Sequence, residues 1–284
     1  MRDLYLEAVL LGCQWPSSLS EFAELLWLFA TGWGGFRLAW DDYDYKNQRS
    51  TYAWYGSRRE IDARLRSSPV SLDEWNALVL YSPRGFPFSA PMKWEEMRAR
   101  DGWIADLGWG LIEGTNESFI RVGGILIGKP RGDLAKFTDL YLSSLKQITL
   151  DLVPRCKPAL VLCGEQRFEG AIERGNAKAL ARRRIWKIDW VNVFGPSYVE
   201  KFGKEFLLAA PGFFKVEFLS DHVLYQPTEG FLPGEASNPS PGQIEGYFST
   251  HAMIGKVAYR PWLASELGQG ARSRRQAGRE PSEE

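Results

Sequence analysis

Histidine and cysteine are scarce in this sequence. Its 284 residues include two histidines, His222 and His251, and three cysteines, Cys13, Cys156 and Cys163. A zinc site or a disulfide framework needs more ligands at closer spacing, and no CxxC pair is present. No local motif places either histidine beside a nucleophile, as Ser-His-Asp and Cys-His enzymes require. We therefore expect buried free thiols, no bound metal, a reducing compartment such as the cytoplasm, and a protein that is not an enzyme.

Phosphate-binding loops, long apolar runs and net charge are also missing. Residues 32–35 (GWGG) have neither the spacing nor the lysine of a phosphate-binding loop, and no cofactor is expected. No apolar run approaches the roughly 18 residues that span a bilayer, and Asp3 and Glu7 interrupt the first run, so neither a membrane span nor a signal peptide is expected. Thirty-five basic and thirty-five acidic residues cancel, so no overall field attracts nucleic acid or a membrane.

The sequence does contain enough apolar material for a large core, with 44% hydrophobic and 14% aromatic residues. Periodicity and turn residues predict an alternation of strands and helices. We expect strands over 4–11, 36–40, 77–81, 119–127, 159–163, 186–194, 213–219 and 222–226, and an irregular strand or a hairpin over 102–114. Helices are expected over 18–31, 57–66, 92–100, 134–152 and 196–202. On the strand over 213–219, Lys215 and Glu217 are expected to face outward.

The order of elements from residue 119 onward is that of a ferredoxin-like βαββαβ unit. We therefore predict an α+β fold in which antiparallel sheets carry helices packed on one face. The first half also begins with a strand, a helix and a strand, so two similar halves are an open alternative. The predicted parts are an N-terminal α+β half over 1–115, a ferredoxin-like half over 116–264 that includes a surface loop over 227–246, and a disordered tail over 265–284.

The best-defined stretch is residues 186–203 (WKIDWVNVFGPSYVEKFG). It reads as a strand that stops at Gly195, a turn, and a helix that Pro196 opens and Gly203 ends. Tyr198 and Phe202 share one face of that helix with Val199 and should pack back onto the sheet. Nothing in this stretch titrates near neutral pH, so we interpret it as architectural.

A second stretch is a candidate binding surface. Three aspartates and two tyrosines follow the strand predicted over 36–40, with two tryptophans nearby in the sequence. Three carboxylates are costly to bury, so this segment should be exposed. Carboxylates beside aromatic rings suit a surface that binds a basic protein, because the charges attract it and the rings form desolvated anchors. A solvated loop is the simpler alternative. The candidate residues are Trp33, Asp41, Asp42, Tyr43, Asp44, Tyr45 and Trp54.

A third stretch is basic. Between Arg167 and Lys187, seven basic residues face two acidic ones, which gives a local charge of +5. Such a patch can hold phosphates, so the alternative function is that of a nucleic-acid-binding or enzymatic protein that uses residues 167–187. A solvated loop or helix is the simpler interpretation, because this segment connects two predicted strands.

The run at 190–196 (WVNVFGP), continued by Tyr198-Val199 and Phe202-Gly203, resembles the immunity protein 52 family of bacterial toxin-antitoxin and type VI secretion systems. The resemblance covers about residues 119–230 and supplies no catalytic residues. It implies a cytoplasmic protein that neutralises a cognate effector toxin by binding it, and the toxin is commonly a nuclease of restriction-endonuclease-like fold. The expected partner is thus a toxin protein, with no direct contact to nucleic acid or membrane. The chain itself is expected to be a monomer or a homodimer.

Overall fold

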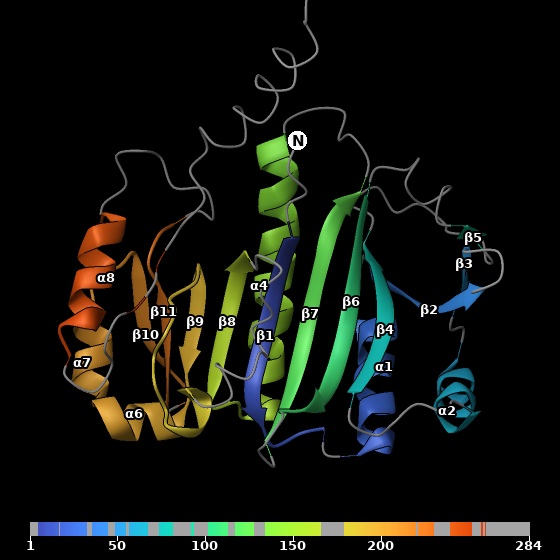
Figure 1. The fold of residues 1–284 in the computed structure, drawn as a ribbon, viewed down its shortest axis with the longest axis horizontal. Coiled ribbons are helices and arrows are strands. Elements are labelled where there is room, and N and C mark those ends of the chain that lie inside the picture. The colour runs from blue at the N-terminus through green and yellow to red at the C-terminus, as the bar shows by residue number, and fades with distance from the viewer. Residues whose placement is uncertain are drawn as a thin grey trace, which may run out of the picture.

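In the part of the chain that the structure describes, eleven strands form one continuous sheet (Figure 1). The structure is a computed structural model. It describes residues 5–16, 18–32, 36–44, 49–54, 57–67, 74–81, 92–93, 102–112, 117–127, 134–165, 179–219, 221–229, 239–251, 257 and 259.

Most of these elements lie where the sequence predicts them. The strands are β1 (Tyr5–Cys13), β2 (Phe36–Asp44), β3 (Arg49–Trp54), β4 (Glu74–Tyr81), β5 (Met92–Lys93), β6 (Gly102–Leu111), β7 (Ser118–Ile127), β8 (Leu160–Glu165), β9 (Val191–Phe194), β10 (Phe214–Phe218) and β11 (His222–Gln226). The helices are α1 (Leu19–Gly32), α2 (Arg58–Ser67), α4 (Leu134–Cys156), α6 (Pro196–Phe202), α7 (Lys204–Ala209) and α8 (Pro241–Ser249).

Within the described part of the chain, the strand order is β10-β11-β9-β8-β1-β7-β6-β4-β2-β3-β5, and every neighbouring pair is antiparallel. The predicted α+β class with an antiparallel sheet is therefore confirmed. None of the described helices is both long enough and apolar enough to cross a membrane.

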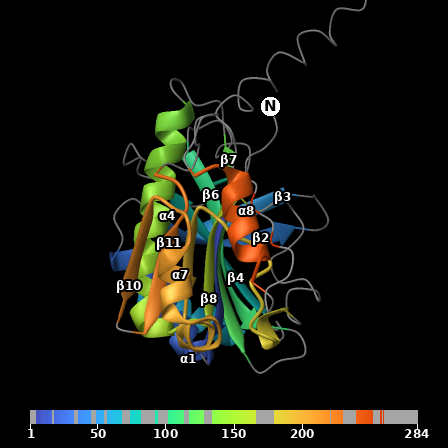
Figure 2. The same cartoon turned by 90° about the vertical axis from the view of Figure 1, so that its left-hand side faces the viewer.

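Helices cover both faces of the sheet. Leu10 of β1 packs in one core cluster with Leu25 of α1 and Leu152 of α4. The neighbouring Val9 packs in a second cluster with Tyr198 of α6 and Phe248 of α8. Figure 2 shows α4 and α8 on opposite sides of the sheet. The prediction that helices pack on one face is therefore wrong. The central strands are apolar on both faces, and each face needs its own cover.

The C-terminal half also differs from a ferredoxin-like unit in its strand order. β7, α4 and β8 do form a split βαβ unit, because β7 and β8 each pair antiparallel with a strand that lies between them. That strand is β1, from the N-terminus, instead of a strand from the same half. β9, β11 and β10 follow outside β8. β1 suits this central position because its consecutive apolar residues Ala8, Val9, Leu10 and Leu11 are buried on both faces of the sheet. The division near residue 115 and the similarity of the two halves stay predictions.

Local predictions differ from the structure in several places, and neither β3 nor α7 was predicted. The regular strand predicted over 186–194 is limited to β9. Residues 92–93 form β5 where a helix was predicted over 92–100, and residues 94–100 lie outside the described part. The loop predicted over 227–246 ends in helix α8. The signal for α8 is a capping box, in which Ser240 Oγ accepts from the Gln243 N–H and Gln243 Oε1 accepts from the Ser240 N–H.

The motif at 190–203 is architectural, as its sequence predicts. A Cβ on Gly195 would lie 2.2 Å from the Pro158 carbonyl oxygen, and the Gly195 N–H donates to the Ala159 carbonyl at 2.8 Å. Only glycine fits so close an approach of two backbone segments. Pro196 then begins α6, and Gly203 ends it at a φ of 86°. α7 begins at the next residue.

Side chains of the same motif join the strand to its surroundings. The Asn192 amide donates to the Asp189 carbonyl at 2.7 Å and accepts from the Asp189 N–H at 2.9 Å, which holds the turn before β9. Tyr198 and Phe202 are buried, and the Phe194 and Tyr198 ring centroids are 6.3 Å apart. α6 therefore packs onto the sheet through the face that its spacing predicts.

Candidate functional site

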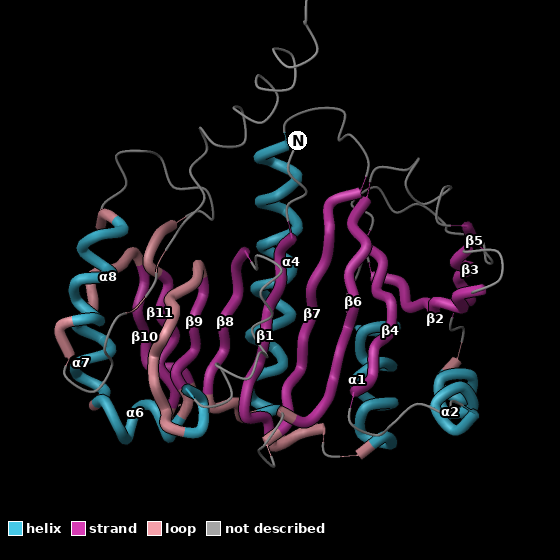
Figure 3. Tube along the Cα trace, viewed as in Figure 1, coloured by secondary structure: helices cyan, strands magenta, loops and turns pink. Residues whose placement is uncertain are grey.

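Five of the predicted toxin-binding residues lie toward one end of the sheet, on the hairpin of β2 and β3. Only Phe36–Ala39 of β2 pairs with β4, whereas Ala39–Asp44 pairs with Arg49–Trp54 of β3. Beyond Ala39, β3 is the one described strand that pairs with β2. The acidic part of β2 therefore leaves the body of the sheet, and its trace runs sideways from β4 (Figure 3).

The structure brings most of the predicted binding residues onto this hairpin. Strand positions two apart belong to the same face, so Asp42 and Asp44 share one face while Asp41 and Tyr43 share the other. Trp54 lies at the end of β3, and Trp33 and Tyr45 lie outside the described residues.

The basic stretch is only partly available as a binding surface. Arg182 and Arg184 are exposed, whereas Arg183 and Lys187 are half-buried and paired with carboxylates. Burial and the neighbouring Arg184 and Arg183 lower the pKa of Lys201, whose Nζ donates to the Arg182 carbonyl. The other predicted basic residues, Arg167, Arg174 and Lys178, lie outside the described part.

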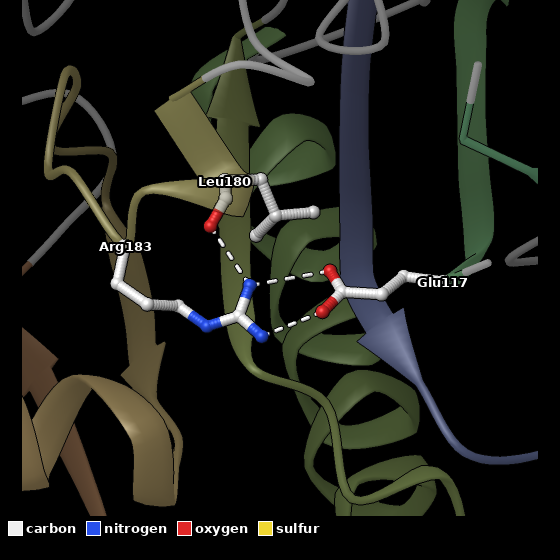
Figure 4. A network of polar contacts seen from close by, with 3 residues as sticks. All are labelled: Glu117, Leu180 and Arg183. Carbon is white, nitrogen blue, oxygen red and sulfur yellow. Dashed lines mark hydrogen bonds and ion pairs between the residues drawn. The ribbon is translucent and has the colours of Figure 1, made fainter. Parts of the chain in front are cut away.

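Arg183 ties this basic turn to the start of β7 (Figure 4). One guanidinium nitrogen, Nη2, donates to Glu117 Oε1 at 2.5 Å, and the other, Nη1, donates to Glu117 Oε2 at 3.2 Å and to the Leu180 carbonyl at 2.8 Å. The Arg183 and Glu117 side chains are 25% and 30% exposed. Such bidentate pairing fixes both partners. Arg183 thus has a structural contact, which the sequence did not indicate because its partner is distant in the chain.

Lys187 has a similar contact with a buried acid. Its Nζ lies 2.9 Å from Asp189 Oδ1. Asp189 Oδ2 is buried and has no hydrogen-bond partner among the described residues. Burial raises the pKa of Asp189, although Lys187 opposes that shift. Burial also raises the pKa of the nearby Cys163 thiol, with the Asp189 charge as a smaller cause. Asp189 and Cys163 are buried and Lys187 is half-buried and paired, so this cluster offers no exposed group.

His222 and the three cysteines are buried, and His251 is half-buried. His222 is 2% exposed; its Nδ1 lies 2.5 Å from Asp221 Oδ1, and its Nε2 is buried without a partner among the described residues. The His251 ring packs 4.5 Å from the Phe206 ring, measured between centroids. All three cysteines are buried and free, and burial raises the pKa of Cys13. Among the described residues, no group of three or more His, Cys, Asp or Glu side chains could hold a metal ion.

The end of the sheet opposite the hairpin carries an exposed apolar strand that the sequence did not reveal. β10 is the last described strand at this end. Its residues Phe214 and Val216 are 42% and 38% exposed, and Phe213 and Leu219 beside it are 54% and 43% exposed. Of the two residues predicted to face outward, Glu217 is exposed and Lys215 is half-buried. Phe218 packs against the core cluster that includes residues of α4, whereas the other apolar side chains of this strand are exposed.

Comparisons with known proteins give little further information. No family model and no curated protein matches this chain. One solved structure with some similarity is that of the toxic C-terminal tip of CdiA from Pseudomonas aeruginosa in complex with immune protein. The match has 10% identity and a TM-score of 0.32, and it covers 59% of this chain and 90% of that chain. A similarity this low carries no argument, and membership of the immunity protein 52 family stays a prediction.

Proposed function

We propose that this chain is an immunity protein that binds and occludes a cognate effector toxin in the cytoplasm and catalyses no reaction. The observation that carries the proposal is the β2–β3 hairpin. Its acidic strand leaves the sheet beyond Ala39 and pairs there with β3 alone among the described strands. Three aspartates on such an extension suit recognition of a basic partner. A secreted nuclease fits this description, because a protein that binds nucleic acid carries a basic surface.

The state of the reactive side chains supports a binding role. A general base must reach a nucleophile or a substrate proton, and His222 is buried while His251 packs on Phe206. A nucleophilic cysteine needs a lowered pKa and access to solvent, whereas Cys13 and Cys163 are buried with raised pKa values. These side chains are better explained as core residues than as catalytic ones.

The alternative function, phosphate or nucleic-acid binding through residues 167–187, has weaker support. Arg183 and Lys187 already pair with Glu117 and Asp189. Arg182 and Arg184 remain exposed, but two exposed arginines occur on many protein surfaces. Salt-sensitive binding of the purified chain to DNA, reduced by Arg182→Ala with Arg184→Ala, would support this alternative.

The proposal is tested with the toxin encoded by the adjacent gene. We expect the two proteins to co-purify and the chain to protect cells that express the toxin. Changing Asp41, Asp42 and Asp44 to asparagine removes three charges with little change in size. Association with the toxin should then slow by about tenfold or more at low salt, because close opposite charges mainly accelerate encounter.

A matched control removes three negative charges elsewhere. Asp151→Asn, Glu200→Gln and Glu205→Gln change exposed acids on α4, α6 and α7. This variant should associate at a rate close to that of the wild type. If the hairpin variant and the control associate and protect equally well, the hairpin is not the contact surface. If the wild-type chain neither binds the toxin nor protects, the proposed function is wrong.

A further inference from the structure

The apolar edge strand β10 has a sequence that is complementary to itself. Its five residues, Phe214-Lys215-Val216-Glu217-Phe218, read the same in both directions if a basic residue is matched with an acidic one. From this we propose that β10 pairs with β10 of a second copy of this chain, antiparallel about a two-fold axis at Val216. The eleven-stranded sheet would then continue across the dimer.

The described structure leaves the outer edge of β10 available. β10 pairs with β11 on one side, from Phe214 opposite Gln226 to Phe218 opposite His222, and is the terminal strand of the described sheet. In Figure 2, β10 lies to the left of α7 and α8, and neither helix is drawn over it. An edge strand presents unpaired N–H and C=O groups, which another strand can satisfy.

Charge selects the register of this pairing. With the axis at Val216, Lys215 of each copy lies opposite Glu217 of the other, so two opposite-charge pairs form across the interface. Moving the axis to Lys215 would place two lysines opposite each other, and moving it to Glu217 would do the same with two glutamates. Like charges directly opposite are destabilising. Charges on edge strands often prevent pairing altogether, but this alternation permits one register.

The same register joins the exposed apolar side chains. Val216 pairs with Leu224, which belongs to the core cluster under α4, so Phe214, Val216 and Phe218 occupy that face of the sheet. In the dimer, Phe214 would lie opposite Phe218 of the second copy, and the two Val216 residues would face each other. Both copies would cover apolar surface that is exposed in the single chain, where Phe214 is 42% and Val216 38% exposed.

The charged residues have only weak contacts within the chain. Glu217 pairs with Lys204 of α7, and both side chains are well exposed, at 38% and 43%. Lys215 Nζ donates to the Ala210 carbonyl at 2.9 Å. The exposed Glu217–Lys204 pair contributes little to stability. The Lys215 contact is one hydrogen bond at a half-buried position, so charge reversal at either residue should lower stability only modestly and leave the fold intact.

The experiment uses charge reversal and analytical ultracentrifugation over a dilution series in the micromolar range. We expect the wild type to form dimers as its concentration rises. Lys215→Glu turns both interface pairs into pairs of glutamates, and Glu217→Lys turns both into pairs of lysines. Each variant alone should therefore dimerise at least about tenfold more weakly than the wild type. An equimolar mixture of the two variants should form heterodimers, because every glutamate then meets a lysine. The double variant K215E/E217K should dimerise as the wild type does.

Controls separate this interface from general charge effects and from unfolding. Glu200→Lys makes the same charge change as Glu217→Lys at an exposed position of α6, outside β10 and α7, and its dimerisation should match the wild type. Thermal melts should show that all variants are folded. A wild type that stays monomeric throughout the series would overturn the proposal, as would single variants that dimerise as strongly as the wild type or a mixture that forms no heterodimer.

The dimer and the toxin-binding role can be tested separately. β10 and the hairpin lie at opposite ends of the sheet, so two copies joined at β10 would keep both hairpins free. The two single charge-reversal variants should therefore still bind toxin and protect cells.

Discussion

Replacing Arg183 by alanine should destabilise the fold by about 2 kcal/mol. Arg183 makes three hydrogen bonds, two to the Glu117 carboxylate and one to the Leu180 carbonyl. Fully exposed ion pairs contribute about 0.2–1 kcal/mol, whereas removing one partner of a buried pair costs about 3–5 kcal/mol. With side chains 25% and 30% exposed, this pair lies between those limits. The loss should appear as a lower urea midpoint with an unchanged m-value.

The neighbouring arginines provide matched controls. Arg182 and Arg184 are exposed, so their alanine variants should stay within about 0.5 kcal/mol of the wild type. Arg183 has a φ of 49°, so comparing Arg183→Gly with Arg183→Ala separates the cost of this backbone conformation from the loss of the ion pair. A left-handed conformation costs a non-glycine residue about 1–2 kcal/mol, so the glycine variant should be roughly 1 kcal/mol more stable than the alanine variant.

A double-mutant cycle with Glu117→Gln measures the pair itself. We expect a coupling free energy of about 1–2 kcal/mol between the two side chains. If Arg183→Ala is no more destabilising than Arg182→Ala, or if the coupling is close to zero, the pair does not stabilise the fold. Arg183 would then be available to other partners, and nucleic-acid binding by the basic stretch would gain support.

Two further predictions concern the motif around β9. Gly195→Ala should destabilise the fold by about 3 kcal/mol or more, because the new Cβ would lie 2.2 Å from the Pro158 carbonyl oxygen. Gly246→Ala in α8 should instead stabilise the fold by about 0.5–1 kcal/mol, because no atom lies within 4 Å of its Cβ position. Equal effects of the two substitutions in thermal melts would contradict this prediction. Burial raises the pKa of Asp189, so the folded state keeps a proton that the unfolded chain has lost, and the free energy of unfolding should fall as pH rises from the ordinary carboxyl value through the higher native pKa. Asp189→Asn should remove this part of the pH dependence in urea titrations, and an unchanged slope would refute the assignment.

Much of the secondary structure could be predicted from the sequence, because helix caps and short-range periodicity act over a few residues. The helix predicted over 18–31 is α1, and the motif at Gly195, Pro196 and Gly203 forms the turn and helix that its residue types favour. The capping box of α8 was also present in the sequence, in Ser240 and Gln243, although the surrounding proline and glycine residues favoured a loop.

The candidate sites were less predictable. The acidic run from Asp41 to Asp44 was visible in the sequence, but its place at the end of the sheet, on a strand that divides its aspartates between two faces, depends on pairing with β3 and β4. The pairing of Arg183 with Glu117 joins residues far apart in the chain, so no local pattern could indicate it.

The sequence by itself determined the α+β class, the strand-turn-helix motif and the scarcity of catalytic side chains, because these follow from residue type and spacing. Only the tertiary structure decided that β1 lies between β7 and β8, that helices cover both faces, and that β10 is left at an edge. Strand order depends on which distant segments bury each other's apolar faces. A strand's sequence records that it has an apolar face, but its neighbours decide whether that face is covered.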